Sequence, residues 1–82
     1  MFEIESDQDW KDFQEKQETR LLLVTKQACG ICRMIKNDLK KKPLDIPIFT
    51  IDRSDVPSFI QHFNIRQYPS ICLFKGSLHK YW

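Results

Sequence analysis

The chain has 82 residues, of which 41% are hydrophobic and 29% are charged, and its formal net charge is +2. This composition is typical of a globular protein and excludes the disordered class, and the length predicts a single domain over residues 1–82. The small net charge gives no strong attraction to nucleic acid or to anionic lipid, so we expect neither as a partner.

The distribution of apolar residues and cysteines bears on where the protein works. No apolar stretch approaches the roughly 20 residues that span a membrane, and residues 1–10 contain acids but no apolar core of a signal peptide. Three cysteines are too few, and odd in number, for the disulfide framework of a small secreted domain. We therefore expect a cytoplasmic protein that contacts no membrane.

The N-terminal part of the chain predicts a strand, a helix and a second strand. Residues 2–5 alternate apolar and polar side chains, as a short edge strand does. Ser6 or Asp7 is suited to cap a first helix, which we expect to end near Thr19. Residues 21–24 form a continuous apolar run, which is typical of a strand buried on both faces.

A C-x-x-C motif, Cys29-Gly30-Ile31-Cys32, follows this strand and precedes a second helix. In that helix Ile31, Ile35 and Leu39 recur every four residues. Two thiols at this spacing can close into a disulfide across the first turn of a helix, where the helix N–H groups favour a thiolate on the first of them. A strand, a short loop and a C-x-x-C pair that opens a helix indicate a redox site.

The second half of the chain continues the alternation. The expected elements are a strand over residues 48–51, a third helix over residues 56–63, a strand over residues 71–74 and a return strand over residues 78–82. Ser54 or Asp55 is suited to cap the third helix, and a turn at Gly76 joins the last two strands. The order β-α-β-α-β-α-β-β predicts an α/β fold with a mostly parallel central sheet, an antiparallel C-terminal hairpin and no final helix.

Three local motifs follow one another along the chain: A-C-G-I-C-R at residues 28–33, Tyr68-Pro69 before a strand, and L-F-K-G at residues 73–76. This combination resembles the thioredoxin family, which has W-C-G-P-C-K, a cis-proline and an L-F-K-x-G hairpin at these places. The resemblance covers nearly the whole chain. It implies a thioredoxin-like fold and a thiol–disulfide oxidoreductase, specifically a dithiol reductase of protein disulfides.

The cysteine pair has a nucleophile and a resolving thiol. Cys29 precedes the helix, so we expect it to be the more exposed thiol, the attacking nucleophile, and the thiol with the lower pKa. Cys32 lies inside the first turn, which suits the resolving role. Lys26 and Arg33 are close in sequence, and both are expected either to favour the Cys29 thiolate or to remain solvated charges without effect.

The resemblance also implies a substrate-binding residue set. A cis-Pro69 against the cysteine pair would present the backbone of Tyr68 for pairing with an extended substrate. Ile31 is either an apolar lip of this groove or the first core residue of the second helix. Cys72, in a predicted central strand, is expected to be a buried small hydrophobe, with a regulatory or dimer-forming thiol as the alternative.

Two apolar residues stand where the family has charged ones. Leu23 falls at the position of the family's buried aspartate, and Ile48 falls at the position of its partner lysine. The internal acceptor for the proton of Cys32 is therefore missing from its usual place, and the sequence leaves open how Cys32 is deprotonated.

Other classes of function remain as alternatives. A glutaredoxin-like, glutathione-linked oxidoreductase is disfavoured because the segment after Pro69 lacks a G-G-x-D type of motif. A zinc site on the cysteine pair with Cys72, His62 or His79 lacks a second C-x-x-C, so no metal is expected. A thioredoxin scaffold used only for binding is disfavoured because both thiols are retained. We expect a monomer without a cofactor, a disulfide-bearing protein as substrate, and a thioredoxin-reductase-like flavoprotein as electron donor.

Overall fold

The computed structural model describes residues 1–42, 44–55, 67–76 and 78–81. In chain order the elements are β1 (Phe2–Ile4), α1 (Asp7–Glu15), β2 (Thr19–Thr25), α2 (Gly30–Lys41), β3 (Ile48–Asp52), β4 (Ser70–Lys75) and β5 (Leu78–Tyr81). The predicted third helix, over residues 56–63, lies outside the described residues. No helix of the described part is long and apolar enough to cross a membrane.

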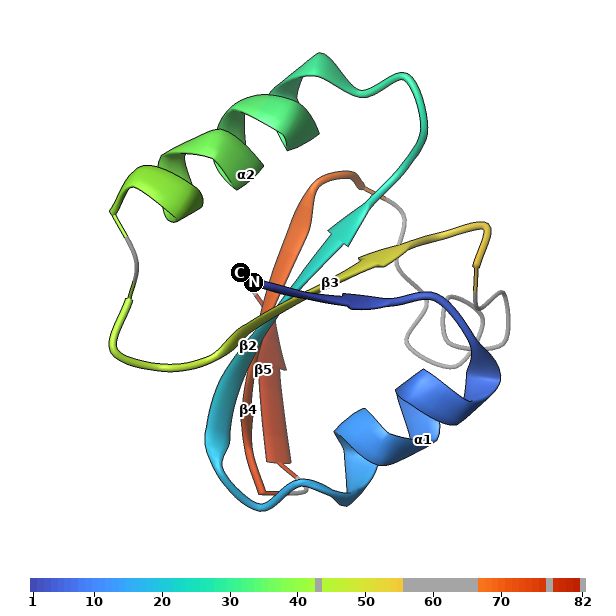
Figure 1. Cartoon of the computed structure of the whole chain (residues 1–82), viewed down its shortest axis with the longest axis vertical. Coiled ribbons are helices and arrows are strands. Elements are labelled where there is room, and N and C mark those ends of the chain that lie inside the picture. Colours follow the sequence, from blue (N-terminus) through green and yellow to red (C-terminus); the bar gives the residue numbers. More distant parts are fainter. Residues whose placement is uncertain (43, 56–66, 77, 82) are drawn as a thin grey trace.

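The strands form one mixed sheet in the order β1-β3-β2-β4-β5 (Figure 1). β3 runs parallel to both β1 and β2, and β5 returns antiparallel to β4 as the short turn predicts. This arrangement confirms the predicted α/β fold class. A second antiparallel pair, β2–β4, was not expected; it arises because β4 begins at the end of the sheet where β2 finishes, with Ser70 opposite Val24.

The first helix is capped as the sequence predicts, but it is shorter. Ser6 is the N-cap, and its Oγ accepts a hydrogen bond from the backbone N of Asp9 at 3.1 Å. The predicted end near Thr19 is wrong: the helix ends at Glu15, because Thr19 already belongs to β2 and pairs with Lys75 of β4.

The two described helices lie on opposite sides of the sheet (Figure 1). Trp10 and Phe13 of α1 pack against one face, in a cluster that includes Leu22 and Val24 of β2. Side chains alternate along a strand, so Leu23 points to the other face, the one that α2 covers. This second layer carries the cysteine pair at its start.

Candidate redox site

The loop between β2 and α2 places the first cysteine at the start of a helix. Ala28 has a positive φ of 56°, an uncommon conformation for a residue other than glycine, and it turns the chain into α2. Cys29 is the N-cap of α2, and its Sγ accepts a hydrogen bond from the backbone N of Cys32 at 3.2 Å. A thiolate at this atom would receive the same N–H group and the positive end of the helix dipole.

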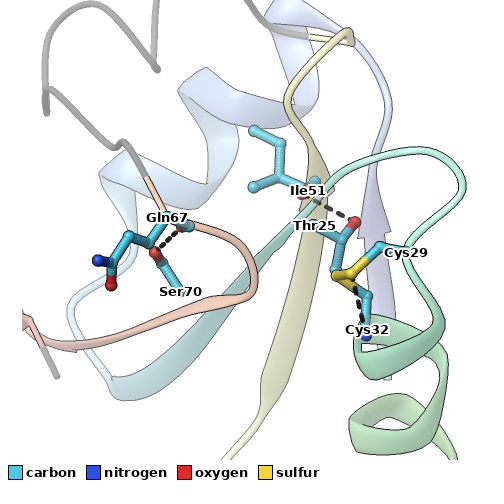
Figure 2. The surroundings of a disulfide bond; sticks show 6 residues. All are labelled: Thr25, Cys29, Cys32, Ile51, Gln67 and Ser70. Carbon is cyan, nitrogen blue, oxygen red and sulfur yellow. Dashed lines mark hydrogen bonds between the residues drawn. A yellow bond between two sulfur atoms is a disulfide. The ribbon is translucent and has the colours of Figure 1, made fainter.

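Cys29 and Cys32 form a disulfide, with their Cα atoms 5.2 Å apart (Figure 2). The two residues differ in burial: Cys29 is half-buried, whereas only 3% of Cys32 is exposed. An incoming disulfide can therefore reach the outer sulfur more easily than the inner one. The geometry matches the predicted order of attack by Cys29 and resolution by Cys32, while the roles themselves remain predictions.

The predicted substrate loop lies at the same end of the sheet. The Tyr68–Pro69 peptide bond is cis, the isomer that the resemblance implies. Ser70 donates a side-chain hydrogen bond to the carbonyl of Gln67, which closes this turn (Figure 2). The pairing of Ser70 with Val24 brings the turn beside the end of β2, from which the cysteine loop departs.

Tyr68 is held from two directions. Its half-buried side chain packs against the core cluster on the α1 face of the sheet. The guanidinium of Arg53 lies 5.6 Å from the centre of its ring. Arg53 is itself anchored, because its backbone N donates to the carbonyl of Thr25 at 2.9 Å. Sequence reasoning missed Arg53, since nothing in its neighbourhood marks it as close to the cysteine loop.

Ile31 faces solvent, with 62% of the residue exposed. Its alternative assignment to the core is therefore wrong. Residues four apart on a helix drift by about 40° per step, so the buried stripe runs through Cys32 and the half-buried Ile35 and Leu39, and Ile31 lies beside it. Met34, one turn further on, is 64% exposed. The two side chains form an apolar surface next to the disulfide, consistent with the predicted lip.

The charged residues expected to tune the thiol are both exposed. Lys26 lies in the loop before Cys29, and Arg33 lies in the first turn of α2. Within the part of the chain that the structure describes, no hydrogen bond joins either side chain to the cysteine pair. Their effect on Cys29 would act through solvent, and it remains a prediction.

The layer beneath the disulfide is apolar where the family has charges. Leu23 is 0% exposed and Ile48 is 7% exposed. On the same face, the polar residue nearest in sequence to the cysteine loop is Thr25, which is 3% exposed and whose hydroxyl donates to the carbonyl of Ile51 (Figure 2). Sequence reasoning missed Thr25; the available signal was a hydroxyl residue that ends an apolar strand just before the cysteine loop.

Cys72 is separated from the redox pair by the sheet. It is 1% exposed and belongs to the core cluster on the α1 face, as expected of a small hydrophobe, and burial raises the pKa of its thiol to about 12. It therefore cannot join Cys29 and Cys32 around one metal ion. Among the described residues no group of three or more potential ligands is arranged for a metal; the side chains of His62 and His79 lie outside them.

A mixed sheet between helices, with a disulfide at the start of α2 and a cis-proline at the neighbouring strand, defines a thiol–disulfide oxidoreductase of the thioredoxin-like type. The family model described as Thioredoxin matches residues 2–81. The chain belongs to the thioredoxin family.

Solved thioredoxins share this fold at low sequence identity. The Trypanosoma brucei brucei thioredoxin is 12% identical, with a TM-score of 0.83 over 98% of this chain and 74% of that one. Thioredoxin O1 from Arabidopsis thaliana, in its oxidized state, is 23% identical, with a TM-score of 0.80 over 96% of this chain and 79% of that one. The reduced thioredoxin pre-protein of Schistosoma mansoni is 19% identical, with a TM-score of 0.83 over 96% of this chain and 79% of that one. No curated sequence relative matches the chain.

Proposed function

We propose that the protein is a dithiol reductase of protein disulfides. The Cys29 thiolate attacks one sulfur of a substrate disulfide, which leaves the second substrate sulfur as a thiolate. The Cys32 thiolate then attacks Cys29 in the mixed disulfide and expels the first substrate sulfur. The substrate gains two electrons and two protons, and the cysteine pair becomes the disulfide seen in the structure.

One observation carries the proposal: the unequal burial of two thiols at a helix N-terminus. The half-buried Cys29 has its sulfur within reach of a helix N–H group, and the buried Cys32 lies 5.2 Å away between Cα atoms. This arrangement suits an accessible thiolate that attacks and a shielded thiol that reacts only within the mixed disulfide.

The surroundings of the pair favour an extended protein segment as substrate. Exposed Ile31 and Met34 offer apolar contact beside Cys29. Tyr68 would offer its backbone for pairing with the substrate chain, in the manner of an added strand. Lys26, Arg33 and the Arg53 that lies over Tyr68 would favour substrates with acidic residues near their disulfide.

The proposal extends to the cellular setting. A reducing direction of electron flow fits the expected cytoplasmic location, where disulfides in proteins are rare and transient. The oxidised pair would then be restored by a flavoprotein of the thioredoxin-reductase class. The protein would work as a monomer, because the reaction uses one cysteine pair.

Reduction of insulin by the protein with dithiothreitol as electron source tests this function. We expect turnover by the wild type, none by Cys29→Ser, and a trapped mixed disulfide with Cys32→Ser. Cys72→Val is the matched control, because it removes the buried thiol and should leave turnover unchanged. Absence of insulin reduction by the wild type would contradict the proposal, and activity only with glutathione would favour the glutaredoxin-like alternative.

A further inference from the structure

The resolving step needs an acceptor for the proton of Cys32. A thiol must become a thiolate before it attacks a disulfide, yet only 3% of Cys32 is exposed to solvent. Leu23 and Ile48, at the positions of the family's charged pair, are buried and apolar. The proton therefore has to leave by a path that other residues of this chain provide.

Thr25 is placed to begin such a path. It is the last residue of β2, it is 3% exposed, and it lies on the face of the sheet that α2 covers, with its hydroxyl directed at the carbonyl of Ile51 (Figure 2). Its hydroxyl donates to the carbonyl of Ile51 at 3.4 Å, which is long for a hydrogen bond between oxygens. The oxygen lone pairs of Thr25 remain able to accept a hydrogen bond from a water molecule.

A polar cavity of about 170 Å³ opens on Thr25. It has room for several water molecules at roughly 30 Å³ each, and its walls offer the polar partners that ordered water needs. The other lining residues are Glu3, Ile4, Glu5, Lys36, Thr50, Asp52 and Asp55. Lys36 follows Cys32 by one helical turn, so the cavity meets the face of α2 that carries the resolving thiol one turn beyond Cys32, which does not itself line it.

Asp52 is the carboxylate nearest to Thr25 in the sheet. The two residues are partners in the register of the parallel strands β2 and β3, which places them side by side on one face. Half-buried Asp52 is held in place by Ser54, whose backbone N and hydroxyl donate to its Oδ1 at 2.9 and 2.6 Å. Among the described residues none donates to Oδ2, which is left to accept a proton.

Charged groups face the cavity from each element around it. The one positive group is Lys36 of α2. The negative groups are Glu3 of β1, Glu5 directly after β1, Asp52 of β3 and Asp55 in the turn after β3. Negative groups outnumber the one positive group, which favours a proton inside the cavity. In agreement, the pKa of Glu5 is raised, first by its hydrogen bond with Glu3 and then by the charges of neighbouring acids.

We propose that Thr25 and Asp52 form the route by which Cys32 loses its proton, an inference that rests on the dithiol-reductase function. The thiol of Cys32 gives its proton to a water molecule held by Thr25 Oγ1, and that water passes a proton to Asp52. The Cys32 thiolate attacks the Cys29 sulfur, so the Cys29–Cys32 bond forms as the bond to the substrate sulfur breaks. The substrate sulfur leaves with the electron pair of the broken bond and takes a proton from solvent. Asp52 then releases to solvent the proton that it received from Cys32.

The two chemical steps can be timed separately with 5,5′-dithiobis(2-nitrobenzoate) in a stopped-flow instrument. Attack by Cys29 releases one coloured thiolate, and resolution by Cys32 releases the second. We expect Thr25→Val and Asp52→Asn each to slow the second release at pH 7 on the order of tenfold, less than the roughly hundredfold minimum typical of a general base, because solvent can still take the proton slowly. The first release should be unchanged, and the second should respond more steeply to pH.

Two matched variants separate the route from general effects of mutation. Thr25→Ser keeps the hydroxyl and should keep the second release within about twofold of the wild type. Asp55→Asn removes one negative charge from the same cavity wall but leaves the carboxylate of Asp52 in place, so it should slow the second release by less than about twofold.

The outcomes are decisive for each claim. Wild-type second release in both Thr25→Val and Asp52→Asn overturns the route, and an equal loss in Asp55→Asn overturns the assignment to Asp52. A fall in the first release by the same factor as the second shows a disturbed fold and also overturns the route. If the wild type itself releases no second thiolate and reduces no insulin, the proposed function has failed, whatever the variants do.

Discussion

The guanidinium of Arg20 lies 4.5 Å from the centre of the Phe13 ring, inside the core at the end of the sheet remote from the disulfide. A second ring, that of Phe74, is 5.2 Å away, and Arg20 is 0% exposed. Its Nη1 donates to the carbonyls of Glu18 at 2.8 Å and Gly76 at 3.2 Å. The cation thereby joins the start of β2 to the β4–β5 turn, and burial lowers the pKa of Arg20.

We expect Arg20→Lys to destabilise the fold by about 2–4 kcal/mol, because an ammonium group lacks the planar stacking surface and the forked donors, yet remains a buried charge. Arg20→Met keeps an apolar chain of similar length without the charge, and should cost less. The free energy of unfolding in urea measures both. Equal stability of Arg20→Lys and the wild type would show that neither the rings nor the carbonyls depend on the guanidinium.

The order of thiol reactivity should follow the order of burial. After reduction, iodoacetamide should modify Cys29 well before Cys32, and the pH midpoint for Cys29 should lie below that of a free cysteine, because the helix N-terminus favours its thiolate. Lys26→Ala and Arg33→Ala should raise this midpoint at low salt, and the effect should vanish at high salt. Mass spectrometry of quenched samples gives both rates. First modification of Cys32 would reverse the assigned roles.

Tyr68 and Arg53 should act on protein substrates more than on small ones. Tyr68→Ile removes the ring that Arg53 covers, a contact of about 0.5–1 kcal/mol at an exposed site. We expect a higher KM for insulin with little change in the rate of the first release from the small aromatic disulfide. Tyr68→Phe keeps the ring and serves as the control. Equal losses with both disulfides would place Tyr68 in the chemistry of the cysteine pair rather than in substrate binding.

The sequence was sufficient to predict the fold and the cysteine pair because both depend on local patterns. Apolar runs marked β2, β3 and β4, the alternatives Ser6 and Asp7 marked the start of α1, where Ser6 proves to be the cap, and the C-x-x-C spacing marked the start of α2. Each of these signals lies within a few residues of the element that it specifies. The antiparallel β2–β4 pair was missed because it depends on where the chain between β3 and β4 returns to the sheet.

Residues whose roles depend on tertiary contacts were not predictable. Nothing in the sequence indicated that Arg20 is buried, because its burial depends on the rings of Phe13 and Phe74 and on two backbone carbonyls. Thr25 was not singled out, because the apolar run covers residues 21–24 and its position beside a cavity depends on α2 and β3 together. Ile31 could be assigned either to the substrate groove or to the core, because its four-residue spacing from Ile35 fits a buried helix face. Only the rotation of α2 about its axis on the sheet determines that Ile31 is exposed.

Ala28 should tolerate glycine better than most positions do. Its φ of 56° lies in the left-handed region, which costs a residue with a Cβ about 1–2 kcal/mol, whereas glycine enters it freely. Glycine also adds flexibility to the unfolded chain, which offsets part of the relief of this backbone cost. Ala28→Gly should therefore leave the free energy of unfolding unchanged or raise it by up to about 1 kcal/mol. Urea unfolding of the oxidised protein measures the change. Ala28→Val is the contrasting variant, and a smaller loss with valine than with glycine would contradict the argument.

Cys72 should make the stability depend on alkaline pH. Its pKa is raised by burial from an ordinary value of 9.0 to about 12, so the folded state keeps the proton where the unfolded chain loses it. The contribution is complete below pH 9 and falls as the pH rises toward 12, by at most about 1.4 kcal/mol per pH unit. Cys72→Val fills nearly the same space without a titrating group, and lysines and tyrosines titrate alike in both proteins. Urea unfolding at pH 8 and at about pH 10.5 should therefore show a steeper loss for the wild type, and parallel losses would mean that the thiol is not shielded in the fold.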